Sequence, residues 1–112
     1  MSVRTLKSAS EIDALFKSGR RGSGRLVVVL ASPTPDQRDP RGRVLFIAGK
    51  RLGGAVVRNR SKRVMREAVR RAGGPWAGVD VAIIARPGAQ GATPVELDRA
   101  LAGAMTAAGV IR

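Results

Sequence analysis

The sequence predicts a small α/β protein in which helices pack on one sheet to form a two-layer sandwich. The first observation is three apolar runs of strand length, at residues 26–31, 44–48 and 79–85. The second is the order helix, strand, strand, helix, strand, helix, which places a helix between two strands and predicts some parallel pairing. The third is the length, because 112 residues fit one core, so residues 1–112 are expected to form a single domain.

The first helix is predicted at residues 8–19. Ser8 can cap this helix, and Glu11, three residues later, completes a capping box. Ile12 and Phe16 lie at i and i+4, which places both side chains on one face of the helix.

The three predicted strands differ in their surroundings. After a basic, glycine-rich connection at residues 20–25, the first two strands flank a loop at residues 32–43 that contains three prolines. These two strands are predicted to pair as a hairpin. The strand at residues 79–85 is apolar almost throughout, which predicts that both of its faces are covered.

The last helix is predicted to begin with a second capping box. Thr93 caps it, Pro94 occupies its first position and Glu96 completes the box. The side chains expected on its core side are Val95, Leu101, Met105 and Ala108.

The charge of the chain points to a polyanionic partner. Lys and Arg number 21 against eight Asp and Glu, which gives a net charge of +13. So high a positive charge destabilises the compact state through self-repulsion unless a polyanion binds. The Arg guanidinium is suited to binding phosphates and to stacking on bases. Nucleic acid is therefore the first expected partner and an anionic membrane surface the second.

The composition also excludes several classes of function. The chain has no Cys and no His, which removes disulfides, thiolate chemistry, the usual zinc sites and imidazole catalysis. No apolar run approaches the roughly 20 residues that cross a bilayer, and no segment near the N-terminus is typical of a cleaved leader. A cytoplasmic protein without a membrane partner is expected.

The most unusual segment is the helix predicted at residues 57–72. Residues 55–71 contain seven cations and one acid. At about 100° per residue, a row of cations at i+4 spacing forms on one side of the helix and a stripe of small apolar side chains on the other. The row contains Arg58, Lys62, Arg66 and Arg70, with Asn59 and Arg63 beside it; the opposite side gathers Val57, Ser61, Val64, Met65, Ala68 and Ala72.

Two interpretations of this basic side compete, a solvated surface and a polyanion-binding surface. Like charges at i and i+4 destabilise an isolated helix, and solubility alone would be served better by alternating charges. Nine cations and one acid between residues 50 and 71 leave +8 of the net charge in about one fifth of the chain. Such a focus of charge favours polyanion binding. The apolar side lacks the Leu, Phe or Trp typical of a membrane-surface helix.

The segment KRLGGAVVRNRSKRVMREAVRR, residues 50–71, resembles the signature of the bacterial ribonuclease P protein subunit. The shared features are a basic pair, a glycine turn, Ala-Val, Arg-Asn-Arg, a Lys-Arg step and a further Arg. The surrounding frame is similar as well, from LFKSGR in the first helix to IIARPGA at the end of the last strand.

This resemblance implies a left-handed crossover around the basic helix and a ribonucleoprotein that cuts the 5′ leader from precursor tRNA. The catalytic RNA subunit would carry the chemistry and hold the Mg²⁺ ions, so no protein residue is expected to be catalytic or to bind metal, and no small-molecule substrate is expected. The implied partners are that RNA and the precursor-tRNA leader. The implied RNA-binding residues are Lys50, Arg51, Arg58, Asn59, Arg60, Lys62, Arg63, Arg66 and Arg70; the implied leader cleft contains Ile12, Phe16, Lys17, Val27 and Val29.

The acidic residues agree with a protein that does not itself cut RNA. Hydrolysis by a protein needs a general acid and base or carboxylates clustered around metal ions, and the eight acids form no closely spaced pair on an evident cleft. Two alternatives remain, a structural RNA-binding protein of the ribosome and a DNA-binding regulator. The first usually carries a long basic tail, and the second would need a helix at a short turn before the basic helix.

Overall fold

The computed structural model describes residues 17, 19–33 and 42–110. The elements in this part of the chain are β1 (Arg20–Ser23), β2 (Val27–Pro33), β3 (Val44–Ile47), η1 (Lys50–Leu52), α2 (Ala55–Arg71), β4 (Val79–Ala85), η2 (Ala89–Gly91) and α3 (Pro94–Ala107). Of the predicted first helix, the described residues include Lys17, which is helical and exposed, and Gly19, whereas Ile12 and Phe16 lie outside them.

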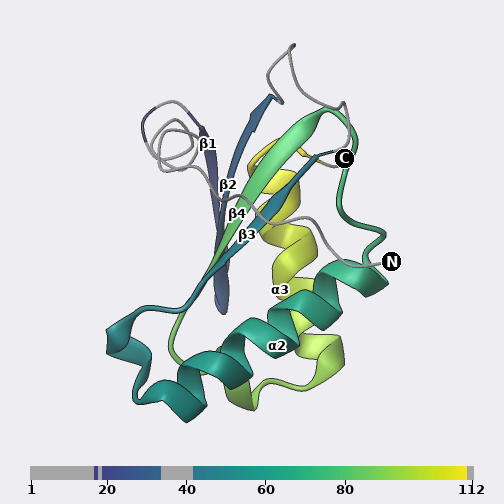
Figure 1. Cartoon of the computed structure of the whole chain (residues 1–112). Coiled ribbons are helices and arrows are strands. Elements are labelled where there is room, and N and C mark those ends of the chain that lie inside the picture. The colour runs from purple at the N-terminus through teal and green to yellow at the C-terminus, as the bar shows by residue number, and fades with distance from the viewer. Residues whose placement is uncertain (1–16, 18, 34–41, 111–112) are drawn as a thin grey trace.

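The four strands form one sheet in the order β1-β2-β4-β3 (Figure 1). β2 pairs antiparallel with β4, and β3 pairs parallel with β4. The predicted hairpin between β2 and β3 is therefore wrong, because β4 lies between them. The apolar sequence of β4 explains this central place: a strand flanked on both sides and covered on both faces needs almost no polar side chains.

The two layers are the sheet and a pair of helices, α2 and α3, which cover the same face of it (Figure 1). Alternate residues of β2, β3 and β4 point to that face. The core under the helices contains Val27, Val29, Val44, Phe46, Val81 and Ile83, whereas Leu30 and Ala82 are buried on the opposite face. The predicted α/β two-layer class is confirmed.

The sequence signals did not reveal β1. Its four residues, RRGS, contain no apolar side chain, and three of the four are exposed. The exception is Gly22, whose backbone packs against α3 so closely that a Cβ would collide with the carbonyl oxygen of Ala104. β1 exists because β2 offers an unpaired edge and because glycine lets a helix approach the chain closely.

The N-terminus of α3 has the predicted capping box. The Thr93 hydroxyl accepts from the Glu96 amide, and the Glu96 carboxylate accepts from the Thr93 amide. The expected core side is correct for Leu101, Met105 and Ala108 but wrong for Val95, which is 61% exposed. Leu97 is buried instead, since it lies four residues before Leu101 on the same face.

Candidate nucleic-acid interface

α2 packs on the sheet through four fully buried side chains. They are Ser61, Met65, Ala68 and Val69. Ser61 is polar, but its hydroxyl donates to the Val57 carbonyl one turn earlier, so its burial leaves no group unpaired.

The buried stripe is turned by about 40° from the side that the sequence pattern predicted. Met65, Ala68 and Ser61 belong to it as predicted, Val57 and Val64 are half-buried, and Ala72 is exposed. Val69 was not assigned to the buried side because its helical position falls between those of Arg58 and Lys62 in the cation row. The shift brings two members of the cation row to the edge of the interface, and Arg58 and Lys62 are half-buried there. Long cationic side chains tolerate this position because their apolar stems can lie against the protein.

The outward side of α2 is strongly cationic. Its exposed polar residues among those implied to bind RNA are Asn59, Arg60, Arg63, Arg66 and Arg70. Lys50 and Arg51, in η1 just before the helix, are exposed as well. The structure thus brings all nine implied residues to one helix and the turn that leads into it. We call this set the α2 basic surface.

Two of these arginines are held by neighbouring elements. The Arg66 guanidinium lies 5.3 Å from the centre of the Phe46 ring on β3, a cation–π geometry that also limits the directions the side chain can take. The Nε of Arg60 donates to the Gln90 carbonyl in η2 at 3.2 Å. Both contacts leave other guanidinium N–H groups available to a ligand.

A third arginine, Arg71, joins the two helices instead of facing outward. It makes a bidentate ion pair with Asp98 of α3, with Nη2 2.8 Å from Oδ1 and Nε 3.0 Å from each carboxylate oxygen. The hydrogen bond to Asp98 raises the pKa of Arg71 above its ordinary value. This pair fixes the C-terminal end of α2 beside α3.

The first turns of α2 carry a shallow hollow of about 410 Å³, lined by Val56, Asn59, Arg60 and Arg63. Val56 is 82% exposed and, with Val95, is one of two large apolar side chains that are exposed in the described residues. Sequence reasoning missed Val56, although its spacing of three, four and seven residues from the other three could have placed it on their face. Cations around an exposed apolar side chain can bind phosphate and cover a base or sugar together.

The implied leader cleft needs a correction. Val27 and Val29 are 1% and 0% exposed and belong to the core under the helices, so they line no open surface. The side-chain alternation of β2 explains the error, because residues of this parity face α2 and α3. Lys17 is exposed, and Ile12 and Phe16 lie outside the described residues.

Three of the four acids in the described residues make structural contacts. Glu96 caps α3, Asp98 pairs with Arg71, and the buried Asp80 accepts from the Arg43 amide at 3.2 Å. Among residues 17, 19–33 and 42–110, no three His, Cys, Asp or Glu side chains come together as a metal site would require. In the same ranges, no helix combines the length and apolar character of a membrane span.

The sequence and the fold can be compared with those of known proteins. The sequence profile of the family described as Ribonuclease P matches residues 2–109. The ribonuclease P protein component of Brevibacillus brevis is 35% identical over 112 residues, covering 96% of this chain and 84% of that protein. The one from Beutenbergia cavernae is 39% identical over 110 residues, covering 97% of this chain and 91% of that protein.

Solved structures show the same fold. The RNase P protein of Staphylococcus aureus superposes with a TM-score of 0.81 at 24% identity, over 99% of this chain and 100% of that one. The RNase P protein of Thermotoga maritima gives a TM-score of 0.73 at 23% identity, over 88% of this chain and 92% of that one. With a family profile that spans nearly the whole sequence, this chain belongs to the ribonuclease P protein family, whose members are RNA-binding components of a tRNA-processing ribonuclease.

Proposed function

We propose that this chain binds the catalytic RNA of ribonuclease P through the α2 basic surface and promotes Mg²⁺-dependent removal of the 5′ leader from precursor tRNA in the cytoplasm. The observation that carries the proposal is the division of α2 into two sides. One side is buried in the core through Met65, Ala68 and Val69, while the other presents Asn59 and four arginines to solvent. A surface anchored in this way offers phosphates a preorganised row of donors.

The charge of this surface predicts how RNA binding responds to salt. If about five or six cations meet phosphates, the log–log slope of affinity against salt should be about −4.5 to −5.4. Arginines contribute more than charge, because a guanidinium can also stack on an exposed base. A slope near zero would show that the α2 basic surface does not contact phosphates.

The Mg²⁺ ions are assigned to the RNA partner in this proposal. The described part of the chain offers no cluster of carboxylates or imidazoles that fits a metal ion, so its residues are not given a metal-binding role. When bound to the RNA, the ions would supply an activated water and stabilise the leaving oxygen. The protein would contribute a positively charged surface that lies against the RNA.

The 5′ leader of precursor tRNA is the second proposed partner. Val27 and Val29 have no part in binding it, because they lie in the core. Lys17 is an exposed cation three residues before β1 and can contribute charge to a strand that passes this edge of the domain.

Reconstitution with the cognate RNA subunit tests the proposal. At low Mg²⁺, the wild-type chain should raise the rate of precursor-tRNA cleavage, and Arg63→Ala should weaken binding of the RNA subunit about tenfold if it loses a charged hydrogen bond. Arg21→Ala is a matched control, since Arg21 is an exposed arginine on β1, opposite Leu30 and therefore directed away from the helix layer. A chain without effect on cleavage, or equal losses for both variants, would contradict the assignment.

A further inference from the structure

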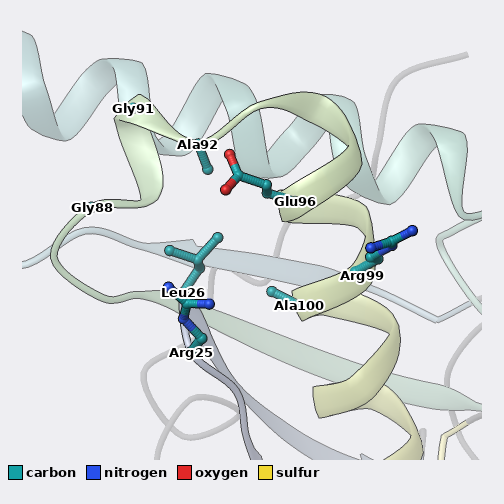
Figure 2. A pocket seen from close by; sticks show the side chains of 8 residues that line it. All are labelled: Arg25, Leu26, Gly88, Gly91, Ala92, Glu96, Arg99 and Ala100. Carbon is teal, nitrogen blue, oxygen red and sulfur yellow. The ribbon is translucent and has the colours of Figure 1, made fainter.

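A second cationic site lies apart from the α2 basic surface. An open cavity of about 560 Å³ is formed by the turn before β2, the η2 loop and the first turns of α3 (Figure 2). This volume is in the range of small-molecule sites. The cavity shares no lining residue with the α2 basic surface, although Arg60 of that surface donates to the Gln90 carbonyl in the η2 loop.

Two arginines line the cavity, and a third braces the turn that carries one of them. Arg25 comes from the turn before β2, and Arg99 projects outward from α3 at the rim (Figure 2). Arg86, at the end of β4, donates through Nη1 to the Gly24 carbonyl at 3.3 Å and so braces the turn that carries Arg25. All three arginines are exposed, and Glu96 is the single acid in the lining.

The floor of the cavity is small and apolar. Leu26 and Ala100 form part of it, and Gly88, Gly91 and Ala92 form the side contributed by the η2 loop. Leu26 is half-buried and packs against the main core, which keeps this floor in place. Gly88 has φ +97°, a left-handed conformation that suits glycine, so this tight loop is fixed by its backbone. A floor of this kind can support a planar base.

The polar group within the cavity is the Glu96 carboxylate, which is directed from α3 toward Ala92 (Figure 2). Its Oε1 accepts from the Thr93 amide at 2.9 Å. The hydrogen bonds from Thr93 are the main reason that the pKa of Glu96 lies below its ordinary value, and the charge of Arg25 contributes further. Glu96 is therefore an ionised acceptor at neutral pH, with capacity at Oε2 for hydrogen-bond donors of a ligand.

We propose that this cavity binds one nucleotide of an RNA strand, with the phosphate at Arg25, the base on the Leu26 floor and the donors of the base on Glu96, while Arg99 at the rim adds positive charge. Guanine fits best because its Watson–Crick edge presents two adjacent N–H donors, one for Oε2 and one for the lone pair of Oε1 that Thr93 does not use. Because two arginines and one acid line the cavity, its net positive charge favours binding of the phosphate. RNA is the occupant because the family binds RNA, and the site stands or falls independently of the α2 basic surface.

Titration of the isotope-labelled full chain with free nucleotides tests this site by NMR. The probes are the 5′-monophosphates of guanosine, adenosine, cytidine and uridine, together with inorganic phosphate. The amides of Gly88, Gly91 and Ala92 should shift in a saturable manner, with the guanosine nucleotide binding about tenfold more tightly than the others or than phosphate.

Three variants separate the contacts. Arg25→Ala should weaken all four nucleotides by about tenfold, because it removes a charge-assisted hydrogen bond to the phosphate. Glu96→Gln keeps an acceptor for the capping box but loses the carboxylate, so the preference for guanosine should fall below about threefold. Arg21→Ala removes the same charge on the other side of the sheet and should change nothing.

Three results would overturn the proposal. The first is the absence of saturable shifts at the cavity amides with any nucleotide. The second is equal affinity for phosphate and for the guanosine nucleotide, which would mean an anion site without a base pocket. The third is an equal loss in Arg21→Ala and Arg25→Ala, which would mean that net charge alone governs binding.

Discussion

α2 and α3 pack side by side on one face of the sheet, yet they are stabilised by different means (Figure 1). α3 begins with a complete capping box, has Pro94 at its start and carries Glu96 in its first turn. α2 begins after Gly54 with no side-chain cap and no acid in its first turn. It also bears four cations at i+4 spacing, an arrangement that weakens an isolated helix.

This difference shows where each helix obtains its stability. The sequence of α3 contains strong local signals for a helix, so its conformation agrees with both local preference and packing. α2 depends on tertiary packing of its buried stripe, because its outward side is occupied by repelling charges. A helix whose exposed side opposes its own stability is understandable if that side is selected to bind a polyanion.

Of the substitutions that test this comparison, Met65→Ala should cause the largest loss of stability. The side chain is 1% exposed, so its truncation should lower the free energy of unfolding by about 2–5 kcal/mol. Arg63→Ala, on the opposite side of the same helix, should stay within about 0.5 kcal/mol. Urea denaturation followed by circular dichroism measures both, and similar losses would show that the two sides of α2 are assigned wrongly.

Thr93→Ala should destabilise the protein by about 1 kcal/mol through loss of the cap of α3. Thr106→Ala is the matched control, because Thr106 is exposed in the last turn of the same helix. Thermal unfolding of the two variants distinguishes them. If Thr106→Ala were equally destabilising, the capping box would not be the source of the local stability of α3.

Phe46→Leu should weaken RNA binding through Arg66. Losing the ring beneath the guanidinium removes about 0.5–1 kcal/mol, or roughly a two- to fivefold change in affinity. In the Arg66→Ala background the same substitution should have no further effect on affinity. Filter binding of the cognate RNA to the four proteins of this double-mutant cycle measures the coupling, and additive losses would exclude it.

The smallest effect is expected from acid titration of Glu96. Its pKa lies below the ordinary value of 4.5 in the folded chain, chiefly through hydrogen bonds with Thr93. A depressed folded pKa contributes stability above the unfolded pKa, and this contribution is lost as the pH falls through the folded value. Comparing the unfolding of wild type and Glu96→Gln between neutral pH and acid should show a smaller loss in the variant. If the stability of the two proteins changed with pH in parallel, the cap would not depend on ionisation of Glu96.

Local sequence signals predicted some parts of this structure well. The bounds of β4 agree with its apolar run, and the cap of α3 agrees with its three signature residues. The basic side of α2 is exposed as its helical spacing predicted, apart from Arg58 and Lys62 at its edge. Each of these features depends on contacts within a few residues, or on the simple separation of charged from apolar side chains.

Other features escaped the same reasoning because distant residues decide them. β1 has a polar sequence and is defined by the edge of β2 and the close approach of α3 at Gly22. The partner of β2 is β4 and not its neighbour in sequence, β3. The parity of β2 places Val27 and Val29 in the core, where they cannot contact a leader strand.

The amino-acid sequence by itself determined that this protein has a two-sided basic helix, a capped final helix and a nearly apolar central strand, because periodicity and capping act over short distances. Only the tertiary structure decided the order of the strands, which side of each strand faces the helices, and the grouping of Arg25, Glu96 and Arg99 around one cavity. Those outcomes depend on which apolar surfaces meet when the chain folds, and residues far apart in sequence contribute to them together.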